Sequence, residues 1–178
     1  MNKSSIMLLL SVIIMGCSGG PAVDREEASR EIDSLYQRFA VAYDSLDTEM
    51  VANLYAEDGF YLVPNPKRAV LKGQSSIRDS FAGFMEGAAA NNRDIEISFR
   101  IINRKISDSL AFDVGYYRTR SKPDSLAEFR GEGSVGKFVT VMGLLPEGKW
   151  EFLLDAYNPA PVAAFSDSEA MHNPLDSN

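Results

Sequence analysis

The chain has 178 residues, a formal net charge of −7 and a single cysteine. This length fits one domain with its own hydrophobic core, and a single cysteine excludes an intramolecular disulfide. The acidic balance, without a basic stripe, argues against nucleic acid as a partner, because binding to phosphates needs clustered lysine and arginine.

Residues 1–16 have the pattern of an export signal. Lys3 gives the positive start, and the apolar run that follows is shorter than the roughly 20 residues that span a bilayer. The run ends at Gly16-Cys17, which resembles the lipobox of bacterial lipoproteins. The resemblance implies that Cys17 carries lipid and becomes the first residue after cleavage. An ordinary secretory signal with a chance cysteine is the alternative.

The lipobox implies an exported protein that is anchored to a membrane through lipid, on the periplasmic side or at the cell surface. Removing residues 1–16 removes Lys3 and no acidic residue, so the mature chain is more acidic still. Residues 17–23 read as a flexible tether. The folded domain is expected over 24–158, and the polar, aperiodic stretch 159–178 as an extended or disordered tail.

The first half of the domain has helical periodicity. Apolar residues recur at three- and four-residue steps over about 24–45, which predicts a helix with one buried face. Asp47 or Thr48 can cap a short second helix, with Gly59 as its stop. Two short strands at 60–63 and 69–71 and a third helix that opens at Gly73 complete this half.

The second half alternates apolar and polar residues with period two, which is typical of strands. Strands are predicted from 95, over 109–120, over about 131–145 and over 149–157. On the strand 109–120 one side carries Leu110, Phe112, Val114, Tyr116 and Arg118. Helices followed by long strands predict an α+β fold, in which the N-terminal helices pack in a curved antiparallel sheet.

Five short motifs stand in the order found in one fold family. They are Tyr43-Asp44-Ser45-Leu46-Asp47, Leu54-Tyr55-Ala56-Glu57-Asp58, Gly73 with Ile77, Asp108-Ser109-Leu110-Ala111 followed by Val114-Gly115-Tyr116-Tyr117, and Gly148-Lys149-Trp150 followed by Asp155 and Asn158. With the element order, they resemble the nuclear transport factor 2-like fold, the cone-shaped fold of SnoaL-like cyclases and ketosteroid isomerases. The resemblance covers about 24–158. It predicts the fold better than the function, because this fold carries many unrelated activities.

The resemblance implies a pocket between the first helices and the concave sheet face. The side chains expected to line it are Phe39, Tyr43, Tyr55, Tyr61, Tyr116, Arg118, Trp150 and Asp155. Asp155 is in phase with Leu153 and Tyr157, so it and Arg118 are candidates for a buried pair inside the cone. Burial in an apolar pocket raises a carboxyl pKa and suits a general base. The alternatives are core aromatics and charges that face solvent near strand ends.

The ketosteroid isomerase slots argue against that reaction. The catalytic tyrosine, the base aspartate and the second aspartate of that family fall here at Phe39, Val63 and Gly136-Lys137, so none of the three groups is present. Asp155 remains as the catalytic candidate. A lone His172 in the polar tail, with a lipidated cysteine, makes no zinc site or triad, so neither a metal nor a cofactor is expected.

Three functions stay open from the sequence. The first is a membrane-tethered module that binds a small, partly apolar ligand or a partner, without catalysis. The second is an isomerase, cyclase or hydrolase-like enzyme with Asp155 as base. The third is a scaffold that forms a homodimer through its sheet.

Overall fold

The computed structural model describes residues 23–91, 93–121 and 134–176. The signal over 1–16, Cys17 and the tether up to residue 22 lie outside the described residues, and so does the segment 122–133. Within the described ranges no helix is both long and apolar enough to cross a membrane.

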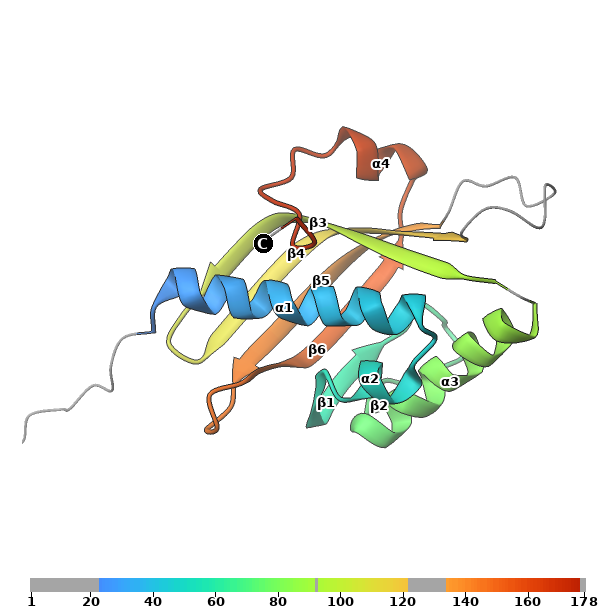
Figure 1. Cartoon of the computed structure of the whole chain (residues 1–178), viewed down its shortest axis with the longest axis horizontal. Coiled ribbons are helices and arrows are strands. Elements are labelled where there is room, and N and C mark those ends of the chain that lie inside the picture. The colour runs from blue at the N-terminus through green and yellow to red at the C-terminus, as the bar shows by residue number, and fades with distance from the viewer. Residues whose placement is uncertain (1–22, 92, 122–133, 177–178) are drawn as a thin grey trace, which may run out of the picture.

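Four helices and six strands make up the described chain (Figure 1). Their bounds are α1 Arg25–Asp44, α2 Thr48–Ala52, β1 Tyr55–Leu62, β2 Leu71–Lys72, α3 Gln74–Ala90, β3 Ile95–Ile106, β4 Leu110–Ser121, β5 Val135–Leu144, β6 Trp150–Pro159 and α4 Val162–Asp167. The strands form one sheet in the order β2-β1-β6-β5-β4-β3. All neighbours are antiparallel except β1 and β6, which pair in parallel. The α+β prediction is confirmed, with a mixed rather than purely antiparallel sheet.

Helix α1 lies across the concave face of the sheet (Figure 1) and forms the centre of the core. It starts at Asp24, whose carboxylate accepts hydrogen bonds from the backbone N–H groups of Glu26 at 2.9 Å and Glu27 at 3.2 Å. This cap satisfies two donors that the first turn leaves unpaired. The face toward the sheet buries Ile32 and Tyr36 almost completely, as the apolar periodicity predicted.

The second helix is shorter than predicted. It ends at Ala52, and residues expected in its last turns form strand β1 instead. The backbone N–H of Phe152 donates to the carbonyl of Leu54 at 2.9 Å, so β6 recruits this segment into the sheet. Gly59 is therefore not a helix stop. A Cβ there would lie 3.1 Å from the carbonyl oxygen of Phe152, so the glycine permits a close backbone approach inside β1.

A β-bulge in β6 sets which of its side chains enter the cone. Leu153 is the extra residue, so the alternation shifts by one there. Phe152 and Asp155 consequently both line the concave side, although they are three positions apart. Leu153 lies on the convex side against Gly143, where an added Cβ would be 2.7 Å from the leucine side chain. The predicted phase of Asp155 with Leu153 is wrong, while that with Tyr157 holds.

Residues 159–176 differ from the expected extended or disordered tail. Helix α4 packs on β4 and β5, and the chain then runs along the edge strand β3 to α1. Ile101 and His172 form an antiparallel bridge, with the Ile101 N–H donating to the His172 carbonyl at 3.1 Å. The segment is ordered because its backbone pairs with the exposed edge of β3, which an aperiodic sequence does not reveal.

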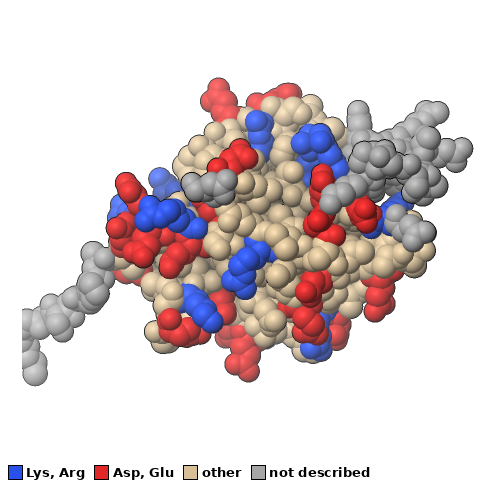
Figure 2. Space-filling view, viewed as in Figure 1, with Lys and Arg blue, Asp and Glu red and all other residues tan. Residues whose placement is uncertain are grey.

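Charged side chains on the face seen in Figure 2 are mixed in sign. Lysine and arginine lie among aspartate and glutamate, with tan, uncharged surface between them. Within the described part of the chain, no group of three or more histidine, cysteine or acidic side chains is arranged to hold a metal ion.

Candidate functional site

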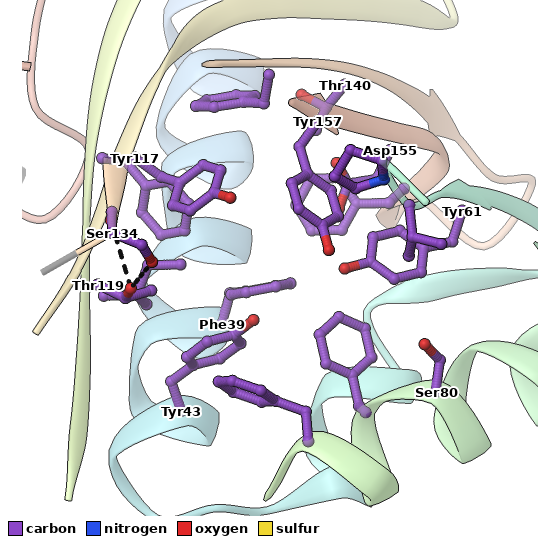
Figure 3. A pocket seen from close by; sticks show the side chains of 18 of the residues that line it. Phe39, Tyr43, Tyr61, Ser80, Tyr117, Thr119, Ser134, Thr140, Asp155 and Tyr157 are labelled. Carbon is purple, nitrogen blue, oxygen red and sulfur yellow. Dashed lines mark hydrogen bonds between the residues drawn. The ribbon is translucent and has the colours of Figure 1, made fainter. Parts of the chain in front are cut away.

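The cone encloses a pocket of about 440 Å³ between α1, α3 and the concave face of the sheet. This volume lies within the range of small-molecule sites, about 300–1,000 Å³. Most of its wall is aromatic, and the rings that line it belong to Tyr36, Phe39, Tyr43, Tyr61, Phe81, Phe84, Phe99, Tyr117, Phe138, Phe152 and Tyr157. Figure 3 shows several of these rings facing a common space.

The rings support one another by edge and stacking contacts. Tyr61 is stacked on Phe81, with centroids 5.2 Å apart, and on Tyr157, with centroids 5.7 Å apart. Phe39 stacks on Tyr43 at 5.0 Å. Aromatic pairs of this kind add stability beyond the area they bury, so the wall is a fixed surface.

Asp155 provides the carboxylate of this pocket. Its Oδ2 accepts a hydrogen bond from the hydroxyl of Tyr55 at 2.8 Å. Burial raises the pKa of Asp155 to about 6, although the hydrogen bond from Tyr55 lowers it. The carboxyl group forms no ion pair with any described lysine, arginine or histidine.

The tyrosine hydroxyls near Asp155 are held protonated. Burial is the main reason that the pKa values of Tyr43, Tyr55 and Tyr61 lie well above the ordinary value, and the negative charge of Asp155 raises them further. The pKa of Tyr117 is raised by burial, then by Tyr157 and Asp155. These groups therefore act as neutral hydrogen-bonding groups at physiological pH.

Two glycine positions shape the wall. Gly136 on β5 is paired with Tyr117 on β4, and a Cβ on Gly136 would lie within 2.3 Å of ring atoms of Tyr117. The missing side chain lets the Tyr117 ring lie over β5. At Gly115, an added Cβ would meet the Arg100 carbonyl oxygen and the Phe138 ring.

Of the eight residues predicted to line the pocket, the structure places four on its wall: Phe39, Tyr43, Tyr61 and Asp155. Tyr55 is fully buried behind the wall and reaches the site through its hydrogen bond to Asp155. Trp150 is buried at the other end of β6 and is not among the lining residues. Val63, in the slot of the isomerase base, does line the pocket.

The expected pair between Arg118 and Asp155 does not form. Arg118 and Tyr116 lie on the convex side, where the Arg118 guanidinium is 4.5 Å from the centroid of the Phe165 ring in α4. On β4 the inward side chains include Ala111 and Asp113, at 2% and 0% exposure, and Tyr117, which lines the pocket. The apolar pattern therefore suggested the wrong face, because this sheet carries apolar residues on both sides.

The convex face of the sheet keeps large apolar side chains in contact with solvent. Leu110, Phe112, Val114 and Val139 are 38–48% exposed, and α4 covers a neighbouring part of the same face. The homodimer through the sheet stays a prediction.

A second cluster, of buried charges, lies between α1 and β3. A bulge at Ile102 shifts the alternation of β3, so Arg104 faces inward opposite Asp113. Arg104 binds Asp113 in a bidentate pair at 2.8 and 2.7 Å and donates to Asp33 at 2.8 Å. Burial lowers the pKa of Arg104, but Asp113 and then Asp33 raise it more.

His172 joins this cluster. Its Nε2 lies 2.9 Å from Asp33 Oδ1, so the lone histidine is a structural contact between the C-terminal segment and α1. No local pattern indicates this contact, because Asp33 and His172 are far apart in the chain. The inward position of Asp113 had a weak signal in the sequence, since Asp113 is two residues from the small apolar Ala111 and therefore lies on the same side of the strand.

The sequence matches no family model, and it matches no curated protein. Solved structures share its fold. A nuclear transport factor 2-like protein with a cystatin-like fold from Novosphingobium aromaticivorans is 19% identical, with a TM-score of 0.62, over 74% of this chain and 81% of that chain.

Two further structures carry functional names. A ketosteroid isomerase-like protein from Erwinia carotovora is 14% identical, with a TM-score of 0.55, over 78% of this chain and 100% of that one. A proposed dehydratase of the nuclear transport factor 2-like family from Streptomyces avermitilis is 16% identical, with a TM-score of 0.58, over 78% and 99%. At these identities the likeness establishes the nuclear transport factor 2-like fold, and the activity is left to the site itself.

Proposed function

We propose that this chain is a membrane-tethered binding protein that holds a small, partly apolar molecule in its cone pocket. The observation that carries the proposal is a preformed aromatic pocket of about 440 Å³ with one half-buried carboxylate and a polar mouth. Sites of this composition, apolar with a few placed polar groups, are typical of small-molecule binding. The membrane anchor is the lipid expected on Cys17.

The pocket is tested by blocking its mouth. Ser80 on α3 lines the entrance, whereas Ser76, one turn earlier on the same helix, is exposed and outside the pocket. The neutral dye N-phenyl-1-naphthylamine is expected to bind the purified chain saturably at one site. Ser80→Trp should weaken this binding at least about tenfold, and Ser76→Trp should leave it unchanged. Equal binding by both variants contradicts a ligand site in the cone.

An enzyme is the second candidate, favoured by one observation. The pKa of Asp155 is raised to about 6 in the aromatic pocket, which suits a general base near neutral pH. The name of the Streptomyces avermitilis neighbour points to the same class of chemistry. Phe39 and Val63 in the isomerase slots weigh against it.

Deuterium exchange separates the two candidates. A base in the cone should catalyse exchange of the acidic C–H protons of 4-phenyl-2-butanone in deuterated buffer, and Asp155→Asn should abolish this exchange. If the intact chain gives only the buffer rate while the ketone still displaces the dye, the pocket binds without this chemistry.

A further inference from the structure

The charges of the pocket are unevenly placed. Among the described residues that line the pocket, Asp155 on β6 is the one carboxylate and Arg68 is the one lysine or arginine. Arg68 is exposed, and its Nη1 donates to the Ser80 hydroxyl at 3.3 Å. The charge that the described side chains place inside the pocket is therefore negative, and their positive group stands at the mouth.

The carboxylate of Asp155 is left with free acceptor positions. A carboxylate has about four lone-pair positions, and Tyr55 is the described residue that donates to it. A charge held away from bulk water is costly unless it is paired or hydrogen-bonded. A ligand that brings donors and a positive charge relieves this cost, and an apolar ligand does not.

Oxygen atoms of the wall extend the negative region. In Figure 3 the side chains of Tyr61, Tyr117 and Tyr157 lie around the same space as Asp155. Their hydroxyl oxygens are acceptors as well as donors, and the negative face of an aromatic ring attracts a cation. The pKa values of Tyr61 and Tyr117 are raised mainly by burial and in part by the negative charge of Asp155. The electrostatic field of the carboxylate is therefore felt at both hydroxyl groups.

We infer that the pocket selects a ligand that carries a protonated amine, with the ammonium group against Asp155 and an apolar body along the aromatic wall. This inference rests on the proposed binding function and adds the chemical class of the ligand. A primary or secondary ammonium fits best, because its N–H groups donate to the free lone pairs of the carboxylate. The net charge of −7 favours the approach of a cation over that of an anion.

An anionic ligand is the main competitor. Its charged end would have to bind Arg68 at the mouth, since an anion beside Asp155 meets like-charge repulsion. A neutral alcohol can donate one hydrogen bond to Asp155 but brings no charge. The three ligand classes therefore differ in the group they present to the same carboxylate.

Three probes of nearly equal size test the inference: 3-phenylpropan-1-amine, 3-phenylpropan-1-ol and 3-phenylpropanoate. Binding to the full chain is measured by calorimetry at pH 7.5, and by displacement of N-phenyl-1-naphthylamine. The amine is expected to bind about tenfold or more tighter than the alcohol, and the carboxylate probe most weakly.

Asp155→Asn identifies the group responsible. The amide keeps the shape and an acceptor for Tyr55 but removes the charge, so the advantage of the amine over the alcohol should disappear while the alcohol binds as before. Asp108→Asn is the matched control, because Asp108 is an exposed acid in the β3–β4 turn, outside the pocket. It removes the same net charge and should leave the preference intact.

The outcomes separate the inference from the proposed function. Equal binding of amine and alcohol, or tighter binding of the carboxylate probe, overturns the inference while the pocket still binds ligand. Failure of all three probes and of the dye to bind overturns both. An amine preference that persists in Asp155→Asn also overturns the inference, because another group would then hold the cation.

Discussion

The hydroxyl of Tyr55 donates to Asp155 Oδ2 at 2.8 Å, from a tyrosine on β1 to an aspartate on the parallel neighbour β6. Tyr55 is fully buried, whereas Asp155 faces the pocket. The pair thus connects the site to the core: the tyrosine fixes the carboxylate, and the carboxylate presents its free lone pairs to the cavity. Above its pKa this carboxyl group is charged, and the charge lowers the stability of the folded state.

Asp155→Asn is expected to stabilise the protein at neutral pH. The pKa of Asp155 in the folded chain is raised to about 6 by burial, from 3.8. A raised carboxyl pKa means that the folded state loses stability as pH rises from about 4 to 6, because the charged form prefers water. The variant should gain about 1–3 kcal/mol in unfolding free energy at pH 7.5 and little at pH 4.

Urea unfolding of both forms between pH 4 and 7.5 measures this difference. Asp108→Asn serves as the exposed control. A gain that is the same at both ends of the pH range, or a loss at pH 7.5, shows that charge burial at Asp155 is not the cause.

Asp113→Asn is expected to destabilise the protein strongly. Asp113 is fully buried and binds Arg104 through two hydrogen bonds. Removing one partner of a buried pair leaves the other charge undercompensated, which costs about 3–5 kcal/mol. Asp33 still contacts Arg104 at 2.8 Å, so the loss should fall at the lower end.

The double variant Arg104→Met/Asp113→Leu tests the reason. Replacing both charges by apolar side chains removes the undercompensated cation but also takes Arg104 away from Asp33, so it should restore only part of the stability lost in Asp113→Asn. A loss below about 1 kcal/mol in the single variant contradicts the buried pair as a stabilising contact.

His172→Ala is expected to loosen the C-terminal segment and leave the rest of the fold intact. The variant removes the contact to Asp33 at 2.9 Å, one hydrogen bond to a charged group, which is worth about 1.5–3 kcal/mol. Hydrogen exchange reports the change directly, because the Ile101 N–H donates to the His172 carbonyl and the Met171 N–H donates to the Ile101 carbonyl. Exchange of these two amides should accelerate, while amides between β4 and β5 keep their protection. Unchanged exchange at Ile101 means that His172 does not hold the segment.

Gly136→Ala is expected to reshape the pocket without unfolding the protein. An added Cβ would lie 2.2 Å from the Tyr117 ring, which can move away because it is the end of a side chain. Dye affinity should therefore change severalfold, whereas Tm falls by only a few degrees. Tyr117→Phe is the companion variant, since it keeps the ring and should keep the affinity for the neutral dye. A Gly136→Ala variant with unaltered dye binding places Tyr117 outside the ligand site.

Cys17→Ser tests the proposed anchor. If lipid is attached at Cys17, the substitution removes the attachment atom, and two or more acyl chains are what give stable membrane binding. The variant should lose lipid labelling and leave the membrane fraction. Membrane association that persists unchanged in the variant contradicts lipidation at this residue.

The fold was predictable from the sequence because two periodicities are local properties of the chain. Steps of three and four residues placed α1 to within one residue at each end, since a helix needs only its own apolar face and its Asp24 cap. The order of helices and long strands gave the α+β class. Phe39, Tyr43 and Tyr61, which line the pocket, followed from the resemblance built on the same order.

The tertiary structure decided which way each strand faces. Bulges at Ile102 and Leu153 shift the alternation by one residue, and they arise from pairing with a neighbouring strand, which no single stretch of sequence specifies. The shift turns Arg104 and Asp155 inward, and the phase of β4 leaves Arg118 outside against Phe165.

Long-range contacts determined which residues pair across the fold. The sequence by itself determined the helices, the strands and the aromatic character of the cone, because these depend on local pattern and composition. Only the folded chain determined that Tyr55 holds Asp155 and that His172 returns to Asp33. Both pairs join residues about a hundred or more positions apart. At that separation the geometry of the whole sheet, rather than local propensity, determines which side chains come into contact.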